Sequence, residues 1–290
     1  MKFNFQEWLP RIVVAPIFLL SLTFIYGLML WNGYLSLSAS RMLPNYEFIG
    51  LKNYFDLFAS DRFQVAMTNI VVFAFLYVSG TIALGVCLAV MLDQKIRAEG
   101  VLRSIYLFPM AISFIVTGTA WRWIFNPGVG IESVVRGWGF ESFTFDWITR
   151  SETALYCIVI AGIWQGAGFV MALFLAGLRG VDDSILKAAA IDGATRFKTY
   201  TRIVLPMLRP VFFSAAIIVT HLAIKAFDLV VALTDSGPGY STDLPATFFF
   251  TIAFDRNQIG VAASSAVVML CMVASIAVPF MYSELRARPR

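Results

Sequence analysis

Six apolar runs, each about twenty residues long, constrain this chain more than any other feature of its sequence. A helix needs about twenty apolar residues to cross the hydrocarbon core of a bilayer, whereas a transmembrane strand needs about ten that alternate in polarity. These runs do not alternate, so we predict an all-α, polytopic membrane protein with six transmembrane helices. The predicted spans are Ile12 to Trp31, Ile70 to Leu92, Ile105 to Ile124, Leu155 to Leu178, Pro210 to Leu233 and Val261 to Met281.

The composition agrees with this class and excludes several kinds of chemistry. Only 14% of the residues are charged, against about a quarter in soluble domains. The single histidine excludes a two-histidine metal site, and the phosphate-binding pattern G-x-x-x-x-G-K-[ST] does not occur. We therefore expect no catalytic residue, no metal site and no cofactor in this chain.

The distribution of lysine and arginine predicts the orientation in the membrane. If both termini lie on one side, that side carries about twice as many of these residues as the other. We therefore predict that both termini and the polar insert 179–209 are cytoplasmic. The same asymmetry accounts for the net charge of +4, so we expect no nucleic-acid partner.

The predicted spans and loops divide the chain into three parts. We assign 1–64 to an N-terminal anchor helix with an external loop, 65–282 to a membrane core that contains the insert, and 283–290 to a cytoplasmic tail.

The insert between the fourth and fifth spans is predicted to fold as a helix, a turn and a helix. Asp192-Gly193 suits a turn with positive φ. Thr195 can cap a second helix, 196–204, which we expect to end before Leu205-Pro206 because proline disfavours helical geometry in the residue ahead of it. Possible N-caps of the first helix are Asp182, Asp183 and Ser184.

Ionisable residues inside a span are costly and therefore indicate function. His221, Lys225 and Asp228 lie in the fifth predicted span at spacings that place them near one helical face. Lys225 and Asp228 either neutralise each other as a structural pair or line an aqueous cavity that binds a solute. The sequence leaves both interpretations open.

Polar and aromatic residues also gather in the third and fourth spans. Taken singly, each favours helix packing. Together, aromatic rings beside hydroxyl and amide groups have the chemistry of a carbohydrate site. These residues are Ser113, Thr117 and Trp121 in the third span and Trp164, Gln165 and Phe169 in the fourth.

The insert carries a resemblance to a known family. The run Lys187-Ala188-Ala189-Ala190-Ile191-Asp192-Gly193-Ala194, followed by Ile203-Val204-Leu205-Pro206, resembles the cytoplasmic E-A-A-x-x-x-G…I-x-L-P loop of permease subunits in ABC importers. The resemblance implies that the first helix docks on an ATPase subunit and that Gly193 forms the turn. The family's leading glutamate is replaced by Lys187, which cannot accept the bonds that a carboxylate accepts.

Three further segments resemble the sugar-importer branch of this family, which includes the maltose and glycerol-phosphate permeases, and most of all the permeases for glucose and mannose. They are Gly50-Leu51-Lys52-Asn53-Tyr54, Trp121-Arg122-Trp123-Ile124-Phe125-Asn126-Pro127 and Thr234-Asp235-Ser236-Gly237-Pro238-Gly239-Tyr240-Ser241-Thr242. The resemblance implies a type-1 permease fold in a bacterial inner membrane. It also implies a second permease subunit, a cytoplasmic ATPase dimer that binds ATP and magnesium, and an external sugar-binding protein.

The resemblance also implies two sets of site residues. Contact with the ATPase is assigned to Lys187, Ala188, Ala189, Asp192, Gly193, Ala194, Leu205 and Pro206. For the solute pathway the resemblance implies Met110, Phe114, Gln165, Gly166 and Phe169, although few of the maltose-site positions keep the maltose permease's side chain. The polar span residues Thr117, His221, Lys225 and Asp228 are assigned to the same pathway on their chemistry. A pathway without its own sugar site, in which the binding protein alone selects, is the competing interpretation.

Three other functions remain as alternatives. A permease for another solute, such as an oligosaccharide, glycerol phosphate, an amino acid or a peptide, would share the insert. A membrane-embedded enzyme would need paired carboxylates, a metal constellation or a Ser-His arrangement, none of which the sequence offers. A scaffolding membrane protein would not need a docking insert.

Overall fold

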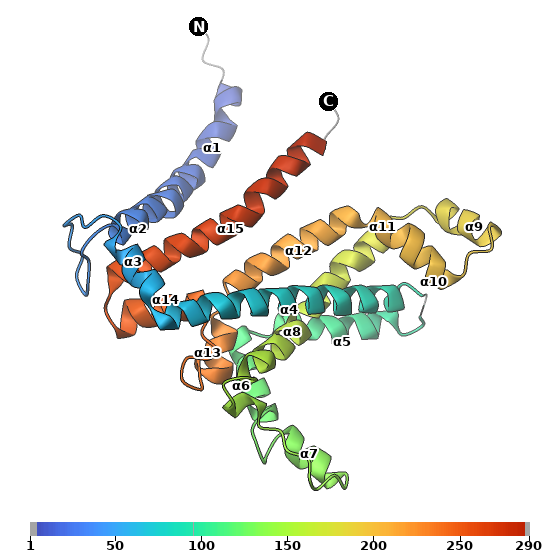
Figure 1. Ribbon diagram of the computed structural model, residues 1–290. Coiled ribbons are helices and arrows are strands. Elements are labelled where there is room, and N and C mark those ends of the chain that lie inside the picture. Colours follow the sequence, from blue (N-terminus) through green and yellow to red (C-terminus); the bar gives the residue numbers. More distant parts are fainter. Residues whose placement is uncertain (1–4, 95, 288–290) are drawn as a thin grey trace. The chain divides into compact units, whose positions relative to one another are not determined.

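The computed structural model describes residues 5–94 and 96–287, and within them the chain is helical without a β-strand. Lys2, Lys95, Arg288 and Arg290, which contributed to the charge asymmetry, lie outside the described residues. Figure 1 shows the helices coloured along the sequence. The chain divides into two compact units. One comprises 1–63 with 248–272, and the other comprises 64–247 with 273–290.

The first unit holds the N-terminal helix and the loop that follows it. A stretch of 24 residues, Val13–Ser36, is long and apolar enough to span a membrane. It is built from α1 (Phe5–Ser21), the π-helix η1 (Leu22–Gly27) and α2 (Leu28–Ser36). The other elements that contribute to this unit are α3 (Lys52–Ala59), α14 (Pro245–Phe250), the π-helix η4 (Thr251–Asp255) and α15 (Ile259–Ala287).

Helix α3 begins within the Gly50–Tyr54 segment and buries one face, which carries Asn53 and Leu57. The Asn53 side chain donates hydrogen bonds to the carbonyls of Ser36 (2.9 Å) and Ser38 (2.8 Å). The amide of Gly260, at the start of α15, donates to the Ser40 carbonyl (2.9 Å). These bonds join residues 36–40 to both α3 and α15.

The second unit contains the longest series of packed helices. Its elements are α4 (Asp61–Leu92), α5 (Glu99–Ala111), α6 (Phe114–Ile124), α7 (Ile131–Gly137), the 3₁₀ turn η2 (Trp147–Thr149), α8 (Ala154–Arg179), α9 (Asp183–Ile191), α10 (Arg196–Thr199), the π-helix η3 (Tyr200–Val204), α11 (Leu205–Met207), α12 (Arg209–Ile224) and α13 (Asp228–Thr234).

Helix α8 is the most deeply buried of the candidate spans. Its small residues let neighbours approach closely, as is usual between membrane helices. A Cβ on Gly168 would lie 2.2 Å from the Tyr106 carbonyl oxygen of α5, and one on Gly162 would lie 3.0 Å from the Tyr77 ring of α4. Glycine is therefore required where α5 crosses α8.

Four of the six predicted spans are confirmed as single long helices: Val13–Ser36, Asp61–Leu92, Ala154–Arg179 and Ile259–Pro279. The described residues reach the predicted six if each of two bent helix pairs, Glu99–Ala111 with Phe114–Ile124 and Arg196–Met207 with Arg209–Ile224, is one span. The prediction of a continuous third helix is wrong, because α5 and α6 meet at a bend of 99°. Pro109 removes one helical N–H donor near the end of α5. Ser113 then caps α6 through its Oγ, which accepts from the Val116 amide at 3.3 Å.

The prediction of a continuous fifth helix, Pro210 to Leu233, is also wrong. Helix α12 has 16 residues and ends at Ile224, and α13 begins at Asp228. At 1.5 Å per residue α12 is about 24 Å long, which is short of the roughly 30 Å hydrocarbon core. Helix α13 packs on α6 at Gly118, where an added Cβ would lie 2.6 Å from that of Ala232.

Candidate functional site

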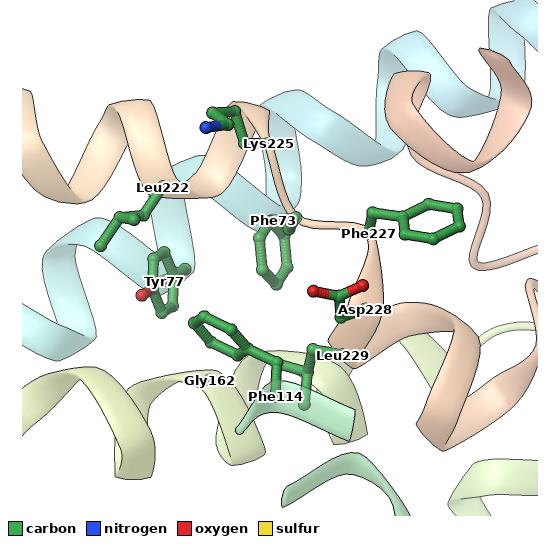
Figure 2. Close-up of a pocket in the computed structure, with 10 residues that line it drawn as sticks. Phe73, Tyr77, Phe114, Gly162, Leu222, Lys225, Phe227, Asp228 and Leu229 are labelled. Atoms are coloured by element: carbon green, nitrogen blue, oxygen red, sulfur yellow. The ribbon is translucent and has the colours of Figure 1, made fainter. Parts of the chain in front are cut away.

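The breaks between α5 and α6 and between α12 and α13 border a cavity of about 210 Å³ (Figure 2). Its walls come from α4, α6, α8, the end of α12, the connecting residues 225–227 and the start of α13. The lining residues are Phe73, Tyr77, Phe114, Gly162, Leu222, Lys225, Ala226, Phe227, Asp228 and Leu229. We refer to this space as the inner cavity.

Lys225 and Asp228 both line the inner cavity, and they do not neutralise each other. Among the described residues neither side chain forms an ion pair or a hydrogen bond. Figure 2 shows the Lys225 ammonium directed away from the Asp228 carboxylate. Asp228 lies in the first turn of α13, where the positive end of the helix dipole favours a carboxylate. The interpretation as a structural pair is therefore not supported.

An aromatic wall from α4 faces these charged groups. Phe73 and Tyr77 stack with their ring centroids 5.3 Å apart and their planes 6° apart, and Phe114 from α6 lies across the cavity from them (Figure 2). Sequence reasoning missed both α4 residues because it treated this span as plain apolar helix. Their spacing of four, which places two aromatic rings on one helical face, was the available signal.

Gln165, Thr117 and Gly166 support the inner cavity from behind its walls. Gln165 is 4% exposed, and its Nε2 donates to the Ile112 carbonyl at 2.7 Å, where α5 gives way to α6. Gly166 leaves room for Tyr77, whose hydroxyl would lie 3.0 Å from an added Cβ. The Thr117 hydroxyl and the Gln165 Oε1 are buried without a hydrogen-bond partner among the described residues. These residues position the walls rather than line the space.

Three other predicted pathway residues lie away from the inner cavity. Met110 is largely exposed on α5, and Phe169 is half-buried on α8. His221 lines a separate groove of about 100 Å³ with Val273 of α15. The expectation that His221, Lys225 and Asp228 share one helical face is wrong, because α12 ends between the first and the last of them.

The insert forms the predicted helix, turn and helix. Asp182 is the N-cap of α9, and its Oδ1 accepts from the Ser184 amide at 2.8 Å, a bond that lowers the pKa of this carboxyl. Gly193 has φ of 73°, and the bonds from the Gly193 amide to Ala190 and from the Ala194 amide to Ala189 close the helix as a Schellman motif. Thr195 caps α10, as predicted.

The predicted end of the second helix before Leu205-Pro206 is wrong. The helical segment runs through η3 and α11 to Met207, and the 69° bend to α12 follows it. Pro206 lacks an amide hydrogen and would break a regular α-helical ladder. The wider π-helical turn at Tyr200–Val204 changes the bonding register just before it, so the chain stays helical.

The insert leaves an apolar and charged surface exposed. Ile191 is 87% exposed and Phe197 is 77% exposed, beside the exposed Lys187 and Ala188. Ala189 is buried instead. Two large apolar side chains on a short helical hairpin are typical of a surface that a partner covers.

Hydrogen bonds tie the insert to the connection between α4 and α5. Tyr200 donates to Asp93 Oδ2 at 2.5 Å, and Gln94 bridges this pair to Arg196. Burial, reinforced by the Asp93 carboxylate, raises the pKa of Tyr200 to about 12. Arg179, at the end of α8, pairs with Glu99 at 2.5 Å. The insert is thus joined to α4, which carries the aromatic wall of the inner cavity.

The described residues contain no cluster of three or more histidine, cysteine or acidic side chains placed to hold a metal ion. The chemistry available to the inner cavity is therefore hydrogen bonding by an ammonium and a carboxylate beside aromatic faces. Such groups can form hydrogen bonds and stacking contacts with a solute.

Comparison with known proteins gives a consistent result. The family model described as "Binding-protein-dependent transport system inner membrane component" matches residues 81–288. A probable ABC transporter permease of Pyrococcus horikoshii is 35% identical over 97% of this chain and 98% of its own length. A xylose/arabinose import permease of Haloferax volcanii is 35% identical over 83% of this chain and 76% of its own. A solved bacterial ABC transporter involved in alginate import shares the fold, with a TM-score of 0.84, 20% identity and coverage of 98% of this chain and 97% of that chain.

Proposed function

This chain belongs to the family of inner membrane components of binding-protein-dependent transport systems, and from that premise we propose that its inner cavity conducts a small sugar. As an ABC importer permease it is a transporter subunit and not an enzyme. We propose glucose, mannose or a related sugar as the solute. The similarity to a xylose/arabinose import permease supports the class of small sugars.

This proposal rests on one observation. Lys225 and Asp228, which have no ion-pair partners among the described residues, lie beside the aromatic rings of Phe73 and Tyr77 at two helix breaks. Lys225 can donate hydrogen bonds and Asp228 can accept them, so together they can bind sugar hydroxyls from opposite sides. The Phe73 and Tyr77 rings offer an apolar surface to the carbon face of the sugar. Because the broken helices meet here, a change at either break alters the shape of the cavity.

We further propose the partners that such a subunit needs. A second permease completes the pathway, an external sugar-binding protein delivers the solute, and a cytoplasmic ATPase dimer holds the ATP and magnesium. The ATPase would dock on the exposed surface of α9, and the ties from Tyr200 and Arg179 would carry its movement to α4 and α8. The assembly would lie in a bacterial cytoplasmic membrane.

The test uses the whole importer, purified with its ATPase and reconstituted in vesicles with the binding protein. We expect Asp228→Asn and Lys225→Gln each to lower the uptake of radiolabelled glucose, mannose or xylose by about tenfold or more. Loss of a hydrogen bond to a charged group corresponds to about 1.5–3 kcal/mol. His221→Gln is the control, because His221 lines the separate groove.

The outcomes separate the two interpretations of the pathway. Normal uptake by both cavity variants would mean that the binding protein alone selects the sugar. Uptake lost equally in His221→Gln would contradict the assignment of the pathway to the inner cavity.

Lys187 gives a separate test of the docking surface. We propose that it faces an acidic residue of the ATPase, so Lys187→Glu should weaken copurification of the ATPase. Unchanged assembly and unchanged sugar-stimulated ATP hydrolysis would reject this contact.

A further inference from the structure

A second and larger cavity, of about 640 Å³, lies along the same two short helices as the inner cavity. Helix α6 contributes its first residue, Phe114, to the inner cavity and Arg122 and Trp123, near its other end, to the larger one. Helix α13 likewise contributes Asp228 to one and Thr234 to the other. We refer to the larger space as the outer cavity. The packed pair of α6 and α13 separates the two.

Two sequence motifs that had no assigned role meet in the outer cavity. Arg122, Trp123 and Asn126 come from the Trp121–Pro127 motif, and Gly237 and Pro238 come from the Thr234–Thr242 motif. These segments are more than a hundred residues apart in the sequence. Only the packing of α6 on α13 brings them together.

The second motif forms a fixed wall. The Thr234 and Thr242 hydroxyls lie 2.8 Å apart, and Thr242 also donates to the Gly237 carbonyl at 3.2 Å. The Gly237 amide donates to the Thr234 carbonyl at 3.0 Å. These bonds hold the loop across the end of α13, so the cavity has a preformed boundary.

The Trp121–Pro127 motif presents side chains whose polar groups have no hydrogen-bond partner among the described residues. Within the described residues, the side chains of Arg122, Trp123 and Asn126 have no hydrogen bond, ion pair or ring contact. Trp123 is 70% exposed. No acidic residue lines the outer cavity, so the Arg122 guanidinium has no local counter-ion there. An aromatic face thus stands beside five guanidinium N–H donors and an amide.

We propose that the outer cavity is a carbohydrate-binding site, where the sugar is held before it passes α6 and α13 to the inner cavity. The Trp123 ring would cover the carbon face of the sugar, while Arg122 and Asn126 donate to its hydroxyl oxygens. A volume of about 640 Å³ lies within the range of ligand pockets, roughly 300–1,000 Å³. The inference rests on the proposed function of the chain as a sugar permease.

Cysteine protection tests the site directly. Thr149→Cys places a thiol in the lining of the outer cavity, where Thr149 now donates to the Asp146 carbonyl at 2.8 Å. The whole importer in nanodiscs, without binding protein, is treated with a membrane-impermeant maleimide. The parental chain, which contains Cys87, Cys157 and Cys271, gives the background.

Glucose, mannose and xylose are the probes. At ten times its dissociation constant, a bound sugar should slow labelling of Thr149→Cys about tenfold. When Thr149→Cys is combined with Trp123→Ala or with Arg122→Gln, the sugar should no longer slow the labelling. Trp123→Phe keeps an aromatic face, so most of the protection from labelling should remain. Asp228→Asn, in the inner cavity, should leave the protection intact.

Three results would overturn the outer site. Labelling unaffected by every sugar would do so, as would protection that survives Trp123→Ala together with Arg122→Gln. Protection by the sugar-free binding protein but not by sugar would show that a protein loop occupies the cavity. Uptake by the same purified importer, measured in parallel after reconstitution in vesicles with the binding protein, distinguishes the two proposals. Uptake without protection rejects the outer site alone, and protection without uptake of any probe rejects the proposed transport of these sugars.

Discussion

The polar insert and the residues of the inner cavity were both predicted to be functional, and the two regions are built in opposite ways. The insert owes its shape to neighbours in the sequence, since Asp182 caps α9, Gly193 ends it and Thr195 starts α10. The inner cavity combines residues from Phe73 to Leu229, which lie on several helices. The comparison shows that a helix-turn-helix insert can be encoded locally, while a cavity between helices requires residues that are distant in the sequence.

The two regions also tolerate change differently. An added Cβ at Gly193 meets nothing within 4 Å, so only its backbone angle restricts that position. An added Cβ at Gly118 collides with another helix. Substitutions near the inner cavity should therefore act through packing, and substitutions in the insert through backbone strain or lost caps.

Substitution of Gly118 should have the largest effect on stability and uptake. Gly118→Ala would place a methyl group 2.6 Å from the Ala232 Cβ and 3.1 Å from the Leu229 carbonyl oxygen. Overpacking of this kind costs about 1–3 kcal/mol. The melting temperature of the purified importer should fall, and uptake with it. Gly100→Ala is the matched control, because no atom lies within 4 Å of that added Cβ. Equal melting temperatures for the two variants would contradict the packing of α6 on α13.

Gln165→Leu should have the next largest effect. It removes the donor to the Ile112 carbonyl and leaves a polar group at the α5–α6 break unsatisfied, at a cost of about 1–3 kcal/mol. Thermal unfolding measures the loss. Thr68→Val is the control, since the Thr68 hydroxyl bonds only within its own helix on an exposed face. A Gln165→Leu protein as stable as the parent would mean that the break does not depend on this bond.

Gly193→Ala tests the locally encoded turn. Left-handed geometry costs a residue with a Cβ about 1–2 kcal/mol. We therefore expect sugar-stimulated ATP hydrolysis to fall roughly fivefold to tenfold while the melting temperature of the membrane part changes little. Gly180→Ala is the control, because Gly180 has φ of −84°. A fall in both variants would show that the turn geometry is not the cause.

Tyr200→Phe should have the smallest effect on stability, about 0.5–1.5 kcal/mol, because the partly exposed hydroxyl loses its hydrogen bonds to Asp93 and Gln94, which follow α4. The rate of tryptic cleavage after Arg196 and Lys198 at neutral pH measures how firmly the insert is held, and it should rise in the Tyr200→Phe protein. The pKa of Tyr200 in the folded protein is raised to about 12. The stabilisation of the insert by the neutral hydroxyl is therefore complete below about pH 10 and is lost as the pH rises towards 12. The Tyr200→Phe protein should not show this loosening of the insert at alkaline pH. If it loosens as the parent does, another titrating group is the cause.

The sequence predicted the fold of the insert well and the lining of the inner cavity only in part. Phe114, Lys225 and Asp228 were predicted and do line the inner cavity, but Phe73 and Tyr77 were missed and His221 lies in a separate groove. The α5–α6 break had a local signal in Pro109 and Ser113. The α12–α13 break had none, because residues 225–227 contain neither proline nor glycine.

The sequence by itself determined the class of this protein, its apolar helices and the shape of its insert, because helix length, caps and left-handed glycine act within a few residues. The tertiary structure alone decided where α12 stops, which charges line a cavity and which motifs meet at the outer one. Those outcomes depend on packing between helices that are distant in sequence. An apolar run of twenty residues has the same pattern whether the helix is continuous or broken.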